Sequence, residues 1–180
     1  DVFDYPARHR ECEKTLIIQE RASVPTRFRN VEPQKWDREK GFLLYGGAGT
    51  GKTHKMARIA RYFAEQGTTK FKWVNVPSFL VNIQANFGNR DFNLQDEICE
   101  LVNQDYLLLD DLGAEKTSEW SVQTLYVVIN GLYENMGKLF LTSNYSPTAL
   151  IELLGDRMIS RIISMAEPFE MKGDDRRLEE

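Results

Sequence analysis

The chain has 180 residues, of which 42% are apolar and 28% are charged, and its formal net charge is −4. This length and composition are typical of one globular domain with a full core and exclude a disordered or fibrous protein. No apolar run approaches the roughly 20 residues that a membrane-spanning helix needs. The two cysteines, Cys12 and Cys99, exclude a disulfide framework. We therefore predict a cytoplasmic protein with no membrane partner, in which any contact with nucleic acid uses a local basic face.

Residues 1–30 are polar and rich in charge, and we interpret them as a lead-in or linker to a domain that spans 31–180. The chain begins at Asp1 rather than Met, which we interpret as the mark of a fragment. A short helix is expected over 16–22, followed by an extended segment over 24–28, because the residue before Pro25 avoids the helical conformation. Phe28 is expected either near a nucleotide base or on the core.

From residue 41 onwards, apolar runs alternate with amphipathic stretches. Strands separated by helices predict βαβ units and a parallel sheet. The expected strands are 42–45, 71–76, 106–109, 139–142 and 168–171, and the expected helices are 54–64, 78–85, 94–103 and a long helix capped by Ser118.

A glycine-rich stretch, 46–53, follows the first strand and precedes the first amphipathic helix. Its sequence, GGAGTGKT, fits the phosphate-binding pattern G-x-x-x-x-G-K-[ST] in the strand–turn–helix context that this pattern requires. Glycines allow successive backbone N–H groups to converge on phosphate oxygens, and the helix N-terminus favours the same anion. We expect Lys52 to reach the β- and γ-phosphates and Thr53 to bind Mg²⁺. The nucleotide-binding residues expected from this pattern are Gly46, Gly47, Ala48, Gly49, Thr50, Gly51, Lys52 and Thr53.

Two carboxylates, Asp110 and Asp111, follow the buried strand 106–109. The carboxyl ends of parallel strands form the edge at which open α/β sheets bind ligands. We expect Asp110 to bind Mg²⁺ through water and Asp111 to orient and polarise the attacking water. Glu115 is a rival for the second role, and Asp111 is then a hydrogen-bonding neighbour of the site.

Five further residues are candidates for the same chemistry. Asn144, at the end of the next strand, either holds the water or senses the γ-phosphate, or else it forms a turn. Arg157 and Arg161 are four residues apart and share one helical face, which is either solvated or offers an arginine finger to a neighbouring subunit. The last basic pair, Arg176 and Arg177, offers another cation to the chain's own nucleotide.

Five sequence blocks together, in this order and spacing, resemble AAA+ ATPases of the bacterial DnaC/DnaI helicase-loader type and the related IstB transposition ATPases. The blocks are VPTRF at 24–28, GGAGTGKTH at 46–54, LDDLGAE at 109–115, TSNY at 142–145 and LGDRMISRI at 154–162. The resemblance extends from about Val24 to Arg177.

The resemblance implies an α/β P-loop NTPase of the AAA+ type. Its parallel sheet would have five strands in the order 5-1-4-3-2, flanked by helices, with a minimal or absent helical lid. It implies that His54 belongs to the nucleotide-binding stretch and that Arg177, or Arg176, is the second sensor. It also implies a catalytic set made of Lys52, Asp110, Asp111, Asn144 and Arg161. In this set Arg161 is the arginine finger, and Arg157 is the second choice for that role. Most AAA+ proteins carry the longer Glu in place of Asp111.

The implied function is that of an ATP-dependent replicative helicase loader, bacterial or phage-encoded, that hydrolyses ATP with Mg²⁺. Its implied partners are a hexameric DNA helicase, single-stranded DNA and further copies of itself in a ring or spiral. We expect this sequence not to include the helicase-binding domain that such loaders carry upstream. Aromatic residues in 78–93 would stack on bases or else belong to the core. The alternatives are an IstB-like partner of a transposase, a small-molecule kinase and a nucleotide-gated binding module that hardly turns over.

Overall fold

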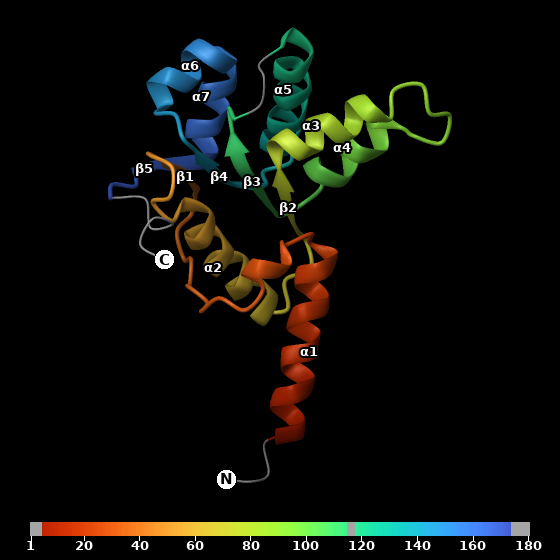
Figure 1. Ribbon diagram of the computed structural model, residues 1–180, viewed down its shortest axis with the longest axis vertical. Helices are drawn as coiled ribbons and strands as arrows, with labels where there is room; N and C mark the ends of the chain where they lie inside the picture. Colours follow the sequence, from red (N-terminus) through yellow and green to blue (C-terminus); the bar gives the residue numbers. More distant parts are fainter. Residues whose placement is uncertain (1–4, 115–117, 174–180) are drawn as a thin grey trace.

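The computed structural model of the protein describes residues 5–114 and 118–173, with side chains from residue 11 onwards. Five parallel strands form one sheet, and helices cover both of its faces (Figure 1). The strands are β1 Gly41–Tyr45, β2 Phe71–Asn75, β3 Tyr106–Leu112, β4 Lys138–Ser143 and β5 Ala166–Glu170. The helices are α1 Tyr5–Arg21, the 3₁₀ turn η2 Thr26–Phe28, α2 Lys52–Glu65, α3 Val76–Ala85, α4 Leu94–Val102, α5 Glu119–Glu134, α6 Pro147–Leu154 and α7 Asp156–Met165.

The strand order is β2-β3-β4-β1-β5, which is the predicted order 5-1-4-3-2 read from the opposite edge. All four neighbouring pairs are parallel, so the predicted parallel sheet is confirmed. The expected minimal or absent lid concerns the residues after β5. Of these, 174–180 lie outside the described residues, and the expectation stays a prediction.

The core has two halves because side chains alternate between the faces of a strand. Leu43, Leu109 and Leu141 face α3 to α7, whereas Phe42 and Phe140 face α2 on the other side. All five side chains are fully or almost fully buried, which explains why the strands read as continuous apolar runs in the sequence. The two layers of helices are seen above and below the sheet in Figure 1.

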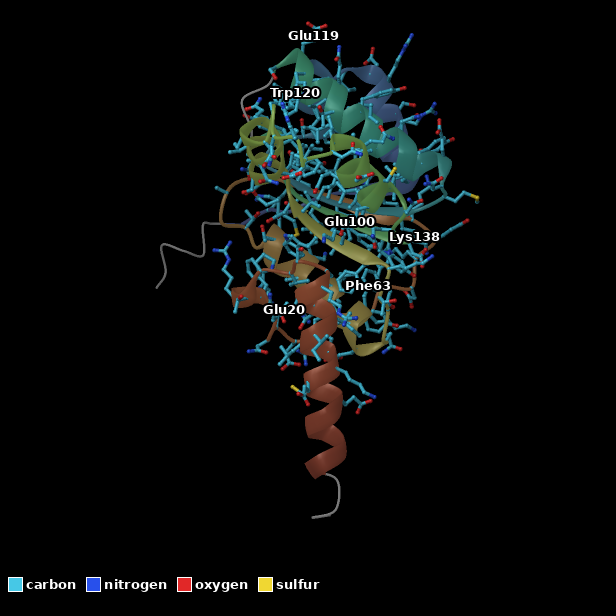
Figure 2. The ribbon with its side chains drawn as sticks, turned by 90° about the vertical axis from the view of Figure 1, so that its right-hand side faces the viewer. Glu20, Phe63, Glu100, Glu119, Trp120 and Lys138 are labelled. Atoms are coloured by element: carbon cyan, nitrogen blue, oxygen red, sulfur yellow. The ribbon has the colours of Figure 1, made fainter. Side chains whose placement is uncertain are left out.

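Helix α1 is longer than the expected helix over 16–22 and projects from the body of the molecule (Figures 1 and 2). Its last turn belongs to the domain, since Gln19 and Ala22 are buried and the backbone N–H of Trp73 in β2 donates a hydrogen bond to Ala22 O over 2.7 Å. The lead-in therefore packs against the sheet-and-helix core. The extended segment expected over 24–28 is wrong for Thr26–Phe28, which form the 3₁₀ turn η2 because the Phe28 N–H bonds back to Pro25 O. The domain boundary between residues 30 and 31 stays a prediction.

Helix α6 lies where the sequence indicated only a turn before Pro147. Ser146 caps it by accepting a hydrogen bond from the backbone N–H of Ala149, and Pro147 occupies its first turn, where a missing N–H costs nothing. Buried Leu150 and Leu154 pack its inner face on the core. Among the described residues, no helix is both long and apolar enough to cross a membrane.

Candidate active site

The candidate site lies at the carboxyl ends of β1, β3 and β4, where the parallel strands place successive loops side by side. A cleft of about 510 Å³ opens at this edge. The lining residues come from η2, the glycine-rich loop, the start of α2 and the ends of β3 and β4: Arg27, Phe28, Ala48, Gly49, Gly51, Lys52, Thr53, His54, Asp111 and Asn144.

The glycine-rich loop between β1 and α2 depends on backbone conformations that glycine adopts most easily. Gly46 has a φ of 138°, and a Cβ there would collide with the carbonyl oxygen of Met171. Gly51, with a φ of 88°, is the N-cap of α2, so the helix begins at Lys52. The first N–H groups of a helix have no intrahelical acceptor, which places donors and the positive end of the helix dipole beside the cleft.

Lys52 is only 6% exposed, although it carries a charge. Its Nζ donates hydrogen bonds to Gly46 O over 2.8 Å and to Gly47 O over 2.6 Å. Thr50 Oγ1 also donates to Gly47 O, which ties the middle of the loop to its start. These contacts hold the ammonium group inside the loop, next to the place where the loop would receive an anion.

Asp110 joins the loop to the centre of the sheet. Its Oδ1 accepts hydrogen bonds from Thr53 Oγ1 over 3.0 Å and from Thr142 Oγ1 over 2.6 Å. Burial raises the pKa of the Asp110 carboxyl above its ordinary value, and the charge of Asp111 adds to the rise. The two threonine hydrogen bonds and the positive charge of Arg27 oppose it. The site therefore holds a carboxylate that is poorly solvated in its charged form.

Asp111 has a φ of 62°, a left-handed conformation that is uncommon for residues other than glycine. It lies at a register shift between β3 and β4 that falls between Leu109 and Leu112, and its N–H donates to Thr142 Oγ1 over 3.0 Å. Such irregularities re-aim side chains at strand ends. Here the irregularity accompanies a carboxylate that lines the cleft, while the neighbouring Asp110 stays buried.

For both Asn144 and Phe28, the sequence left open a role in the site and a purely structural role. Asn144 is exposed, lines the cleft and follows Ser143, whose hydroxyl donates to Leu112 O over 2.7 Å. Phe28 lines the cleft and also stacks on Trp73 with ring centroids 6.1 Å apart, so it packs on the core, while its place near a nucleotide base stays a prediction. His54, a predicted binding residue, also lines the cleft.

Two predicted arginines are not brought to this cleft. Arg157 and Arg161 lie on α7, as expected, but the side chain of Arg161 contacts α5 and neither arginine lines the cleft. The structure does not describe Glu115, Arg176 or Arg177, so their expected roles stay predictions.

Sequence reasoning missed two participants, Thr142 and Arg27. In the sequence, Thr142 is only the last residue of a predicted strand. Once the strand order is known, its hydroxyl is expected beside the strand end that carries Asp110, and the structure shows that contact. In the sequence, Arg27 is one of several basic residues in the charged segment 1–30. Its proximity to the cleft follows from the packing of η2 beside α2, which no local pattern encodes.

Asp110→Asn is expected to stabilise the nucleotide-free protein at neutral pH. Because the raised pKa means that the folded state disfavours the charged carboxyl, the stability contributed by Asp110 falls as pH rises from below its ordinary pKa through its folded pKa. We expect the melting temperature of the variant to exceed that of the parent at pH 7. Differential scanning calorimetry should show this gap shrinking towards pH 4. A variant less stable than the parent at pH 7 would show that the hydrogen bonds outweigh the burial of charge.

The sheet order and the glycine-rich loop at its carboxyl edge define a P-loop domain of the AAA+ class. The sequence matches the model of the bacterial DnaA ATPase domain over residues 29–165. The chain therefore belongs to the bacterial DnaA ATPase-domain family, within which it is DnaC/DnaI-like.

Individual relatives agree with this membership. The replicative helicase loader DnaI of Bacillus subtilis (strain 168) is 29% identical over 151 residues, which is 77% of this chain and 48% of DnaI. The chromosomal replication initiator DnaA of Francisella tularensis subsp. novicida (strain U112) is 33% identical over 121 residues, which is 66% of this chain and 24% of DnaA. The chain thus spans about half the length of the first relative and about a quarter of the second.

Two solved structures show the same likeness in three dimensions. A putative primosome component from Streptococcus pyogenes serotype M3 superposes with a TM-score of 0.70 at 25% identity, covering 89% of this chain and 97% of that one. The crystal structure of DnaI gives a TM-score of 0.64 at 26% identity, covering 91% and 83% of the two chains. The predicted resemblance to DnaC/DnaI-type proteins is confirmed.

Proposed function

We propose that the protein is an ATP-dependent loader that controls the placement of a hexameric replicative helicase on single-stranded DNA in a bacterial cytoplasm. The observation that carries the proposal is the cleft at which the glycine-rich loop, Lys52, Thr53 and Asp111 meet, with Asp110 hydrogen-bonded behind it. Membership of an ATPase-domain family and similarity to a protein described as a replicative helicase loader support it.

The site's own groups fit Mg²⁺ and a nucleoside triphosphate. Thr53 Oγ1 and Asp110 Oδ1 lie 3.0 Å apart, and both are oxygen atoms that can serve as metal ligands. Mg²⁺ that is bound with a nucleotide needs few protein ligands, because phosphate oxygens and water complete its coordination shell. When bound, Mg²⁺ neutralises charge on the phosphates. The backbone N–H groups of the loop and Lys52 would bind the β- and γ-phosphates, and Phe28 and His54 also line the cleft.

In the hydrolysis that we propose, a water oxygen attacks the γ-phosphorus as the bond to the β–γ bridging oxygen breaks, which yields ADP and phosphate. Asp111 would orient and polarise that water, and Asn144 would hold it from the end of the neighbouring strand. Arg161 of another copy of the chain would stabilise the charge that spreads over the γ-phosphoryl oxygens. The nucleotide state would then set how copies pack in a ring or spiral.

Single-stranded DNA would meet the surface formed by α3, the segment after it and the start of α5. Phe87 is 55% exposed and its ring contacts that of Trp120 edge-on, with centroids 5.3 Å apart, while Val81 is also exposed. Figure 2 shows Trp120 at the end of the molecule opposite α1. Exposed aromatic rings are sequence-tolerant stacking platforms for bases. Phe79, by contrast, packs on the core.

The proposal is tested by mixing the protein with a hexameric replicative helicase, ATP and single-stranded DNA and measuring the mass of the complexes. We expect a complex of helicase, loader and DNA that forms with ATP and dissociates when the ATP is hydrolysed. A parallel mixture contains a transposase in place of the helicase. A complex in that mixture but none with the helicase would contradict the loader function. Phosphate release without any phosphorylated acceptor would separate an ATPase from a kinase, and tight ATP binding without turnover would indicate a nucleotide-gated binding module.

A further inference from the structure

Arg161 is held by two neutral groups of the neighbouring helix α5. Its Nε donates a hydrogen bond to Asn130 Oδ1 over 3.2 Å, and its guanidinium carbon lies 4.5 Å from the centre of the Tyr133 ring. Figure 1 shows α5 and α7 beside each other on the face of the sheet opposite α2. The two contacts fix one edge and one face of the guanidinium group.

A second hydrogen bond orients the Asn130 side chain that contacts Arg161. The Asn130 side-chain amide donates to Glu134 Oε1 over 2.8 Å, so its oxygen is turned towards Arg161. The nearby carboxylate therefore pairs with the amide and not with the arginine. Among the described residues, Arg161 has no ion pair, and its two terminal Nη atoms make no hydrogen bond.

Neutral partners have a specific consequence for an arginine. A carboxylate would neutralise the guanidinium and occupy its paired donors, whereas an amide oxygen and a ring face leave its full charge and its Nη donors available. The Tyr133 ring is 39% exposed and Arg161 is half-buried, so the pair lies at the surface of the molecule. This arrangement suits a cation that is held in place for an anion arriving from outside.

That anion is not in the chain's own cleft. Helix α5 starts after the carboxyl end of β3 and ends before the start of β4, so its last turns run towards the amino edge of the sheet. Asn130 and Tyr133 belong to those turns, whereas the cleft lies at the carboxyl edge. Arg161 does not line the chain's own cleft and is placed to meet a phosphate group on another molecule.

We infer that Asn130 and Tyr133 are positioning residues that hold the Arg161 guanidinium ready to enter the nucleotide cleft of a second copy of this chain. The inference rests on the proposed function and deepens it, because it assigns to α5 the orientation of the arginine that completes a neighbour's site. Restricting the guanidinium before assembly removes an ordering cost from the assembled state.

The test compares ATP hydrolysis by assembled Tyr133→Leu, Tyr133→Phe and Asn130→Leu proteins. A matched control is Tyr126→Leu, which removes a half-buried tyrosine from the same helix without touching Arg161. We expect Tyr133→Leu to slow hydrolysis by about tenfold, since the cation–π contact is lost, and Tyr133→Phe to keep most of the rate. Asn130→Leu should also slow hydrolysis, and the Tyr126→Leu control should not. Nucleotide affinity should stay unchanged in Tyr133→Leu, because its own cleft is intact.

Mixed assemblies separate positioning from a merely structural role. Adding Asp111→Asn subunits, which supply an intact Arg161 but do not hydrolyse, should restore turnover in the clefts of Tyr133→Leu subunits. Combining Tyr133→Leu with Arg161→Ala should slow hydrolysis no more than Arg161→Ala alone. An unchanged rate in Tyr133→Leu, or a loss not restored by mixing when that of Arg161→Ala is restored, would overturn the inference. A normal rate in assembled Arg161→Ala would overturn the proposed finger itself and this inference with it.

Discussion

Replacing Lys52 with alanine is expected to weaken ATP binding by about 100-fold and to leave no measurable ATP hydrolysis. The ammonium group is buried inside the glycine-rich loop, and charge-assisted hydrogen bonds to phosphate oxygens are among the strongest that a side chain makes. Because nucleotide binding is proposed to set the packing of subunits, ATP-dependent assembly should be lost as well. Titration calorimetry and analytical ultracentrifugation measure the two effects separately.

The matched control for this change is Lys55→Ala, one turn further along α2. Lys55 lies outside the cleft lining and should be replaceable without loss of ATP binding. Since Lys52 donates hydrogen bonds to two loop carbonyls, the variant's melting temperature must also be compared with that of the parent. A folded Lys52→Ala protein that hydrolyses ATP at the parent rate would contradict the assignment of this loop.

Arg161→Ala is expected to lower hydrolysis in the assembled state by about three orders of magnitude, which is the lower end of what an arginine finger contributes. Binding of ATP to the isolated subunit should hardly change, because Arg161 does not line its own cleft. The result is measured as steady-state phosphate release at protein concentrations above and below the assembly midpoint.

Arg157→Ala decides between the two arginines of α7. Arg157 is exposed and lies beside a groove of about 650 Å³ between α5 and the start of α7, one turn before Arg161. We expect this variant to keep assembled-state hydrolysis within a few-fold of the parent. The reverse outcome, a normal rate in assembled Arg161→Ala and a loss in Arg157→Ala, would move the finger to Arg157.

Periodic burial made most of the fold predictable from the sequence. The strand at 106–109 is fully apolar because both of its faces are covered, and the helices between strands leave a parallel sheet as the simplest arrangement. The order of the strands within the sheet could not be predicted in this way. The order β2-β3-β4-β1-β5 came from the family resemblance, because no local pattern records which strands become neighbours.

Local sequence patterns did not predict the elements whose bounds depend on tertiary packing. β3 continues through Asp111 to Leu112, although its acidic residues look like a strand end, because Leu112 pairs with Ser143 of β4 beyond the register shift. Helix α6 was missed because Ser146 and Pro147 are equally typical of a turn and of a helix start.

The candidate site shows the same division. Motif spacing was enough to predict Lys52 and Thr53 as site residues, since both belong to one continuous loop and the start of its helix. It did not reveal the contact of Arg161 with Tyr133 or the place of Arg27 beside the cleft, because each depends on two elements meeting in space. Residues that act through such meetings are visible only once the fold is known.

A crystal structure of the protein with Mg²⁺ and a non-hydrolysable ATP analogue tests the central claim most directly. We predict that the β- and γ-phosphates lie within hydrogen-bonding distance of Lys52 Nζ and the loop N–H groups, and that the metal ion lies beside Thr53 and Asp110. In an assembled form, Arg161 of one copy should contact the γ-phosphate bound by the next. A triphosphate found elsewhere on the molecule, far from Lys52 and Asp110, would contradict this account.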